Sequence, residues 1–288
     1  MISRIPVTSA RSLAEAYALL AERPPGLRVL AGGTDVMVQL NAGQGLDRVG
    51  HVLDIWSVPE LRFVRRSGHS LSIGALTSYS ELMRNTDVQL LCPALSEVSR
   101  EVGAWAIQNR GTIGGNICNA SPAGDTLPLL LAAGAVFHLG GPRGERSVPA
   151  DEFFLGYRRT ALGADELLLR IEIEVDHEFG HLLYRKVGTR RAQSISKTII
   201  ALRARGAESG GLAGVRIAAG CVAPIPLRCK HAEAALEGRT ADEATLALVA
   251  AALQEDIAPI DDVRSNAEYR RRVSATVLTQ LVRRLAGV

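Results

Sequence analysis

The stretch Asn109-Arg-Gly-Thr-Ile-Gly-Gly-Asn-Ile-Cys-Asn-Ala-Ser-Pro-Ala-Gly-Asp125 is the least ordinary part of the chain. It is rich in glycine, asparagine, serine and threonine, and few of its positions are apolar. Paired glycines allow backbone N–H groups to point together into a concave nest, a shape that suits phosphate. We therefore expect a glycine-rich loop around Thr112-Ile-Gly-Gly-Asn116, with an apolar helix over Thr126 to Gly134 behind it.

A second glycine pair lies much earlier in the chain, directly after a buried strand predicted at Leu27 to Ala31. The segment Ala31-Gly-Gly-Thr-Asp35 offers several N–H donors and the Thr34 hydroxyl. Two such loops fit a ligand with two phosphates, a dinucleotide, although each could instead be a tight turn. Neither matches the Rossmann G-x-G-x-x-G pattern or the G-x-x-x-x-G-K-S/T phosphate loop, so nucleotide triphosphate hydrolysis is not supported.

The hydrophobic pattern on either side of these loops predicts a mixed chain of helices and strands. The first region has a helix at Leu13–Glu22, opened by the capping box Ser12-Leu-Ala-Glu15. Other predicted strands lie at Arg48–Ile55, Leu61–Arg65, Ser70–Ile73, Ala135–Leu139, Glu166–Val175, Thr198–Arg203 and Val215–Val222. Other predicted helices begin at Thr77 and Cys92 or span Asp242–Asp256 and Asn266–Leu285, and the polar Asp176–Gly180 is a predicted linker.

The composition is that of an ordinary globular protein with room for two domains. The 288 residues exceed what one core usually organises, and 47% of them are hydrophobic. Balanced charge, 33 Lys+Arg against 30 Asp+Glu, argues against a dedicated nucleic-acid-binding protein. No apolar run approaches the roughly 20 residues that span a bilayer, and the N-terminus lacks the features of a secretion signal. We therefore expect a cytoplasmic protein with no membrane contact.

Patterns for metal binding and nucleophilic catalysis are weak. The four cysteines are dispersed without a C-x-x-C spacing, which argues against a zinc or iron–sulfur site built from cysteines. His177-Glu-Phe-Gly-His181 matches the H-E-x-x-H zinc pattern, but that pattern needs a helix, and the residues before it alternate as in a strand. There is no G-x-S-x-G nucleophile elbow. We expect neither a metal nor a catalytic side chain in this chain.

Short polar side chains follow the second glycine loop. Asn119, Ser121 and Asp125 could hydrogen-bond ribose hydroxyls or the edge of a flavin. Asp125 could instead cap the helix that follows it. The basic segment Arg185–Arg191 could face an anionic ligand or partner, or form a solvated surface.

The chain resembles the medium, FAD-binding subunit of the molybdenum hydroxylases, the xanthine dehydrogenase and carbon monoxide dehydrogenase family. Three stretches carry the resemblance: Ala31-Gly-Gly-Thr-Asp-Val36, Arg110 to Pro128, and Tyr184-Arg-Lys-Val-Gly-Thr-Arg-Arg-Ala192. The resemblance implies an α+β fold, with a two-part FAD-binding domain of the vanillyl-alcohol-oxidase (PCMH) type at residues 1–176. Its subdomains would span about 1–57 and 58–176, and a small C-terminal α+β domain of the carbon monoxide dehydrogenase flavoprotein type would span 177–288.

The resemblance also implies a set of residues that bind FAD. The two glycine segments match the family loops that hold the pyrophosphate from either side, and the remaining positions match those that line the cofactor. The implied residues are Ala31, Gly32, Gly33, Thr34, Asp35, Val36, Thr112, Gly114, Gly115, Asn116, Asn119, Ser121, Asp125, Leu167, Leu168, Tyr184 and Lys186.

In function, the resemblance implies one component of a three-subunit oxidoreductase. FAD in this chain would exchange electrons between the 2Fe–2S clusters of a small subunit and an external acceptor. A large molybdopterin-binding subunit would act on the substrate, and a dimer of heterotrimers is expected. The alternative is a non-catalytic assembly module with a degenerate flavin fold, which the intact glycines of both loops argue against.

Overall fold

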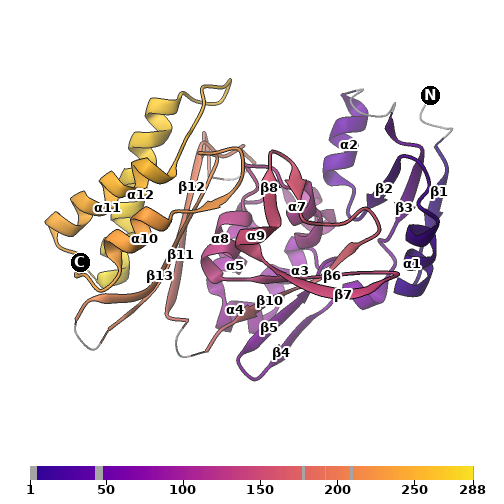
Figure 1. The fold of residues 1–288 in the computed structure, drawn as a ribbon, viewed down its shortest axis with the longest axis horizontal. Helices are drawn as coiled ribbons and strands as arrows, with labels where there is room; N and C mark the ends of the chain where they lie inside the picture. Colours follow the sequence, from indigo (N-terminus) through magenta and orange to yellow (C-terminus); the bar gives the residue numbers. More distant parts are fainter. Residues whose placement is uncertain (1–4, 43–47, 177–178, 192, 208–209, 288) are drawn as a thin grey trace.

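The computed structural model describes residues 5–42, 48–176, 179–191, 193–207 and 210–287, and arranges them in three units along its longest axis (Figure 1). The first unit contains a parallel sheet in the order β1-β3-β2. Its elements are β1 (Val7–Ser9), α1 (Leu13–Glu22), β2 (Leu27–Leu30), α2 (Thr34–Asn41) and β3 (His51–Asp54). The Ser12 side chain accepts from Glu15 N, so the predicted N-cap is confirmed, whereas the Glu15 carboxylate accepts from Arg11 N.

The central unit is built on an antiparallel sheet in the order β4-β5-β10-β6-β7. Its strands are β4 (Val64–Ser67), β5 (Ser70–Gly74), β6 (Val136–Gly141), β7 (Gly144–Pro149) and β10 (Leu167–Glu174), with the small hairpin β8 (Phe154–Gly156) and β9 (Arg159–Thr160). Its helices are α3 (Tyr79–Arg84), α4 (Thr86–Leu91), α5 (Pro93–Glu101), α6 (Trp105–Arg110), α7 (Ile113–Asn119), α8 (Leu127–Ala133) and α9 (Ala150–Phe153), and a 3-10 turn, η3, spans Pro59–Leu61.

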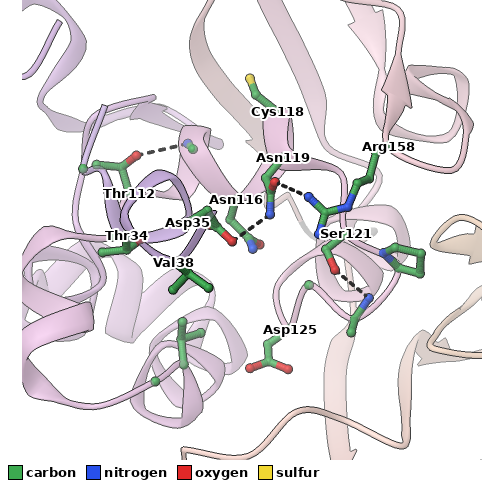
Figure 2. A pocket seen from close by; sticks show the side chains of 18 of the residues that line it. Thr34, Asp35, Val38, Thr112, Asn116, Cys118, Asn119, Ser121, Asp125 and Arg158 are labelled. Carbon is green, nitrogen blue, oxygen red and sulfur yellow. Dashed lines mark hydrogen bonds between the residues drawn. The ribbon is translucent and has the colours of Figure 1, made fainter. Parts of the chain in front are cut away.

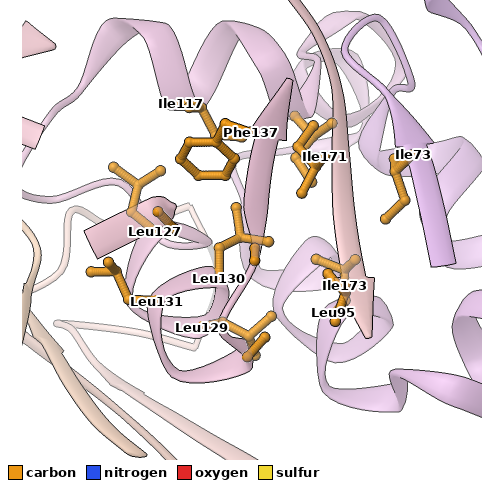
Figure 3. Packing of buried hydrophobic residues seen from close by; sticks show 14 of the residues in the cluster. Ile73, Leu95, Ile117, Leu127, Leu129, Leu130, Leu131, Phe137, Ile171 and Ile173 are labelled. Atoms are coloured by element: carbon orange, nitrogen blue, oxygen red, sulfur yellow. The ribbon is translucent and has the colours of Figure 1, made fainter. Parts of the chain in front are cut away.

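A large apolar core joins this sheet to its helices. Ile171 and Ile173 of β10 pack with Phe137 of β6 and with leucines of α8, all fully or almost fully buried (Figure 3). The rings of Phe137 and Phe153 meet edge to face with centroids 5.0 Å apart, a favourable aromatic geometry. The continuous burial of α8 explains why its sequence is apolar on every side.

The third unit is an antiparallel sheet in the order β11-β12-β13-β14, covered by three helices. The elements are β11 (His181–Val187), β12 (Thr198–Gly206), β13 (Leu212–Gly220), β14 (Leu227–Arg228), α10 (Lys230–Leu236), α11 (Glu243–Asp256) and α12 (Ala267–Ala286). Ala201 and Ala218 on the opposite face join the core of the central unit, where α8 lies. This sheet therefore sits between α8 and its own helices.

The predicted fold class is correct, and most predicted elements lie close to the observed ones. The main error concerns Thr112–Asn116, which the sequence predicts to be a loop and which instead caps and begins helix α7. Helix α2, which begins at Thr34 immediately after the first glycine pair, was also not predicted. No helix among the described residues is long and apolar enough to cross a membrane.

Candidate functional site

A single large cleft of about 1560 Å³ collects nearly all of the predicted site residues. It is lined by the end of β2 and the start of α2, by α7 and the segment after it, by the start of β10, and by loops of the third unit. All of the predicted residues from Ala31 to Leu168 line it. Tyr184 and Lys186 of β11 do not, which is the difference between the predicted and the observed lining.

The first glycine segment places open backbone donors on this cleft. Gly33 has φ +78°, a left-handed conformation that favours glycine, and the chain then enters α2. Within the described part of the chain, no acceptor is found for the N–H groups of residues 33–36. These are the orphan donors of a helix start, and a helix start favours an anion.

The second glycine segment is arranged differently. The Thr112 hydroxyl caps α7 by accepting from Gly115 N at 3.0 Å. Gly114 N donates to Ala75 O at 2.9 Å, and Asn116 N donates to Thr112 O at 3.1 Å. The expectation that this segment would offer the same set of free N–H groups is therefore wrong, because Thr112 and Ala75 already accept from them.

The glycines of the second segment instead permit close packing. A Cβ atom on Gly114 would lie 2.6 Å from both the Cβ and the carbonyl oxygen of Ala75. A Cβ atom on Gly32 of the first segment would lie only 1.8 Å from Arg110 O, and one on Gly115 would lie 4.0 Å from Ala31 Cβ. The two segments thus touch, and the prediction that they converge on one cleft is confirmed.

A series of side-chain hydrogen bonds connects the start of α2 and the end of α7 to the β8–β9 hairpin. Asn119 Nδ2 donates to Asp35 Oδ1 at 2.9 Å, and Arg158 Nη1 donates to Asn119 Oδ1 at 2.9 Å (Figure 2). Burial raises the pKa of Asp35, while Arg158, Arg28 and the amide of Asn119 oppose that shift. Sequence reasoning missed Arg158, and no motif marks it.

Asp125 connects the cleft to the third unit. Its carboxylate accepts from Lys186 Nζ at 2.6 Å and from Ser196 Oγ at 2.7 Å. Burial raises its pKa, and Lys186 is the largest influence that lowers it. The alternative that Asp125 caps the next helix is wrong, because the N-cap of α8 is Thr126 and has no side-chain cap bond. Lys186 also donates to the Glu101 carbonyl, which fixes the ammonium group next to Asp125 although Lys186 does not itself line the cleft.

Two further walls complete the cleft, and one of them is aliphatic. Leu167 and Leu168 of β10 border the cleft together with Val102 and Ile107. The third unit supplies the other wall, which is mixed polar and apolar and comes from its loops and from the first turn of α12. Its residues are Arg190, Gln193, Ser194, Ile195, Cys221, Ala223, Pro224, Ala258, Ile260, Asp262, Arg264 and Arg270. A long cleft with orphan N–H donors at one wall and aliphatic side chains at another fits a flavin dinucleotide.

The H-E-x-x-H pattern has no helix to act from. His177 and Glu178 lie outside the described residues, and His181 begins strand β11. Among the described residues, no group of three or more His, Cys, Asp or Glu side chains is placed to hold a metal ion. Tyr184, three residues on, has a buried hydroxyl for which the described residues supply no hydrogen-bond partner.

Comparisons with known proteins agree with this geometry. Residues 3–174 match the family described as FAD binding domain in molybdopterin dehydrogenase, and residues 183–285 match the CO dehydrogenase flavoprotein C-terminal domain. The xanthine dehydrogenase FAD-binding subunit of Escherichia coli O157:H7 is 32% identical over 275 residues, which cover 95% of this chain and 93% of the relative. The carbon monoxide dehydrogenase medium chain of Hydrogenophaga pseudoflava is 31% identical over 93% of this chain and 92% of its own length.

The fold is likewise that of solved structures. A structure of carbon monoxide dehydrogenase from Hydrogenophaga pseudoflava, which lacks the Mo-pyranopterin moiety of the molybdenum cofactor, superposes with a TM-score of 0.89 at 32% identity. The match covers 96% of this chain and 95% of the other.

Proposed function

The chain belongs to the FAD-binding subunits of the molybdenum hydroxylase family, and we propose that it passes electrons between 2Fe–2S clusters of a partner subunit and an external acceptor. The FAD supplies this redox chemistry when bound. The observation that supports the cofactor's place is the contact of two glycine segments on one cleft, with orphan N–H donors in residues 33–36.

Different residues of the cleft are proposed to contact different parts of the FAD molecule. The N–H groups at the start of α2 and the Thr34 hydroxyl would donate to the diphosphate, and the absence of a side chain at Gly115 would leave room for it. Asn116 accepts from Thr126 with its carbonyl oxygen, which leaves its amide NH₂ to donate to the ligand. Leu167 and Leu168 line the cleft and would shield the flavin ring from water.

Tyr184 and Lys186 do not line the cleft themselves, and we propose that they support the cleft residue Asp125 from β11. Lys186 acts by fixing the Asp125 carboxylate, which reaches the cleft, and Tyr184 packs on the same face of β11. We assign residues 1–176 to the FAD-binding domain, with subdomains of about 1–57 and 58–176, and residues 177–288 to the C-terminal domain. Each domain then contributes walls to the same cleft.

The proposed assembly includes a small 2Fe–2S subunit and a large molybdopterin-binding subunit, in a cytoplasmic dimer of heterotrimers. The relatives are named as FAD-binding subunits or medium chains, which supports a complex of several subunits. In such a complex this chain needs no acid–base or nucleophilic residue, because its part is to bind and orient the cofactor.

Rapid mixing of the three-subunit complex with its substrate tests the proposal. Flavin absorbance should bleach in the complete complex, and should stay unchanged when substrate is mixed with the isolated yellow chain. FAD should be released on denaturation. A colourless chain that still assembles with its partners would contradict electron transfer through FAD and favour an assembly module.

A further inference from the structure

The β8–β9 hairpin carries an arginine to the wall of the cleft, where it bonds Asn119 at the end of α7. Arg158 forms the tip of this hairpin with φ +52°, a left-handed conformation that is uncommon for a residue other than glycine. Strained tips of this kind persist where function requires a side chain in a particular place. The guanidinium here points to Asn119 and lines the cleft (Figure 2).

The bond network around Arg158 reaches the proposed diphosphate position. Asn119 joins the guanidinium to Asp35, which lies in the first turn of α2 beside the orphan N–H donors. Arg158 is exposed and uses one nitrogen in this bond, so further N–H groups of its planar fork remain available. Such forks bind phosphate oxygens with two parallel hydrogen bonds.

Charge balance calls for a cation at this place. A diphosphate carries two negative charges, and Asp35 is already a carboxylate beside it. Two other arginines that line the cleft, Arg264 and Arg270, are paired with the Asp262 carboxylate in the third unit. Arg28 donates to the neutral Gln39 at 2.7 Å. Like Arg158 it lowers the pKa of Asp35, but Arg158 is the one that also bonds Asn119. The hairpin arginine is therefore well placed to balance the ligand's charge.

We propose that Arg158 is a latch that contacts the diphosphate of bound FAD across the start of α2 and slows its release. The inference rests on the proposed function, because it requires FAD in this cleft with its diphosphate at the glycine segments. It adds a specific residue that lies outside both glycine segments, on a hairpin that follows Asn119 by 39 positions in the sequence. Before FAD binds, the Asn119 bond holds the guanidinium near its place of action.

The test measures the rate of FAD release from the purified full-length chain, followed by flavin fluorescence at low and high salt. The variant Arg158→Gln should release FAD about tenfold faster at low salt, as expected when one charge-assisted hydrogen bond is lost. Because salt screens this attraction, the difference should shrink at high salt. Arg159→Gln, a change of the adjacent exposed arginine in β9, is the matched control and should release FAD at the wild-type rate.

A double-mutant cycle separates contact with the ligand from neutralisation of Asp35. Direct contact predicts that Arg158→Gln accelerates release by the same factor with Asp or Asn at position 35. If Arg158 only neutralises Asp35, the effect disappears in the Asp35→Asn background, and the latch is rejected. Release at the wild-type rate from Arg158→Gln, or equal acceleration by Arg159→Gln, would also overturn it. A wild-type chain that holds no FAD would instead contradict the proposed function itself.

Discussion

The two glycine-rich segments share a composition and a cleft, but they use their backbones in opposite ways. Residues 33–36 leave their N–H groups without an acceptor in the described part of the chain. In the second segment, Gly114 N and Gly115 N are already bonded to Ala75 and Thr112. One segment is built to donate to a ligand, and the other is built to let backbones approach. Glycine pairs therefore indicate a site without telling which of these two tasks they perform.

The largest expected effect on stability comes from breaking the buried ion pair between Lys186 and Asp125. Lys186→Met leaves the Asp125 carboxylate buried without its cation, which should destabilise the protein by about 3–5 kcal/mol. Chemical denaturation measures the loss. Lys230→Met, at an exposed lysine, is the control and should change stability by less than about 0.5 kcal/mol. A small loss at Lys186 would mean that this segment does not depend on the third unit.

The stability of the same variant should depend on pH in a direction that the buried carboxylate determines. The pKa of Asp125 in the folded protein is raised above its ordinary value by burial, and Lys186 opposes that rise. Without Lys186 the pKa rises further, so the folded state binds a proton that the unfolded state has lost. The free energy of unfolding of Lys186→Met should therefore increase, relative to wild type, as pH falls from about 8 towards about 5. A difference in the free energy of unfolding between the two proteins that stays constant over this range would contradict the buried ion pair.

The next effect breaks the contact between the segments. Gly32→Ala places a methyl group 1.8 Å from Arg110 O, and backbone must move to admit it. We expect a loss of about 1–3 kcal/mol in stability and of most bound FAD. The flavin-to-protein ratio and a denaturation curve measure both. Gly206→Ala, where a Cβ would meet no atom within 4 Å, should leave both unchanged.

The smallest effects come from one substitution made in each segment. Thr112→Val removes the cap of α7 and should cost about 1 kcal/mol in stability. Thr34→Val removes a hydroxyl at the start of α2 that has no hydrogen bond to any residue the structure describes, so stability should change by less than about 0.5 kcal/mol while FAD binds more weakly. Denaturation curves and FAD titrations compare the pair. If Thr34→Val costs as much stability as Thr112→Val, the contrast between a ligand-binding segment and a structural segment is wrong.

Local signals allowed much of the fold to be predicted, and long-range contacts account for what was missed. The helix at Leu13–Glu22 was predicted because its cap is local. Helix α7 was missed because its glycines have low intrinsic helix propensity, which is overridden where Gly114 packs against Ala75 of a different element. Arg158 was missed because its bond to Asn119 joins positions 39 residues apart. The bond between Lys186 and Asp125 was missed for the same reason, because it joins positions 61 residues apart.

Amide hydrogen exchange, measured on the full chain before and after loading with FAD, tests the central claim most directly. The N–H groups of residues 33–36 should exchange quickly in the FAD-free chain and slowly once FAD is bound, because the diphosphate becomes their acceptor. Those of residues 113–116 should be protected in both states. Slower exchange confined to residues 113–116 on loading, with no change at 33–36, would contradict the account.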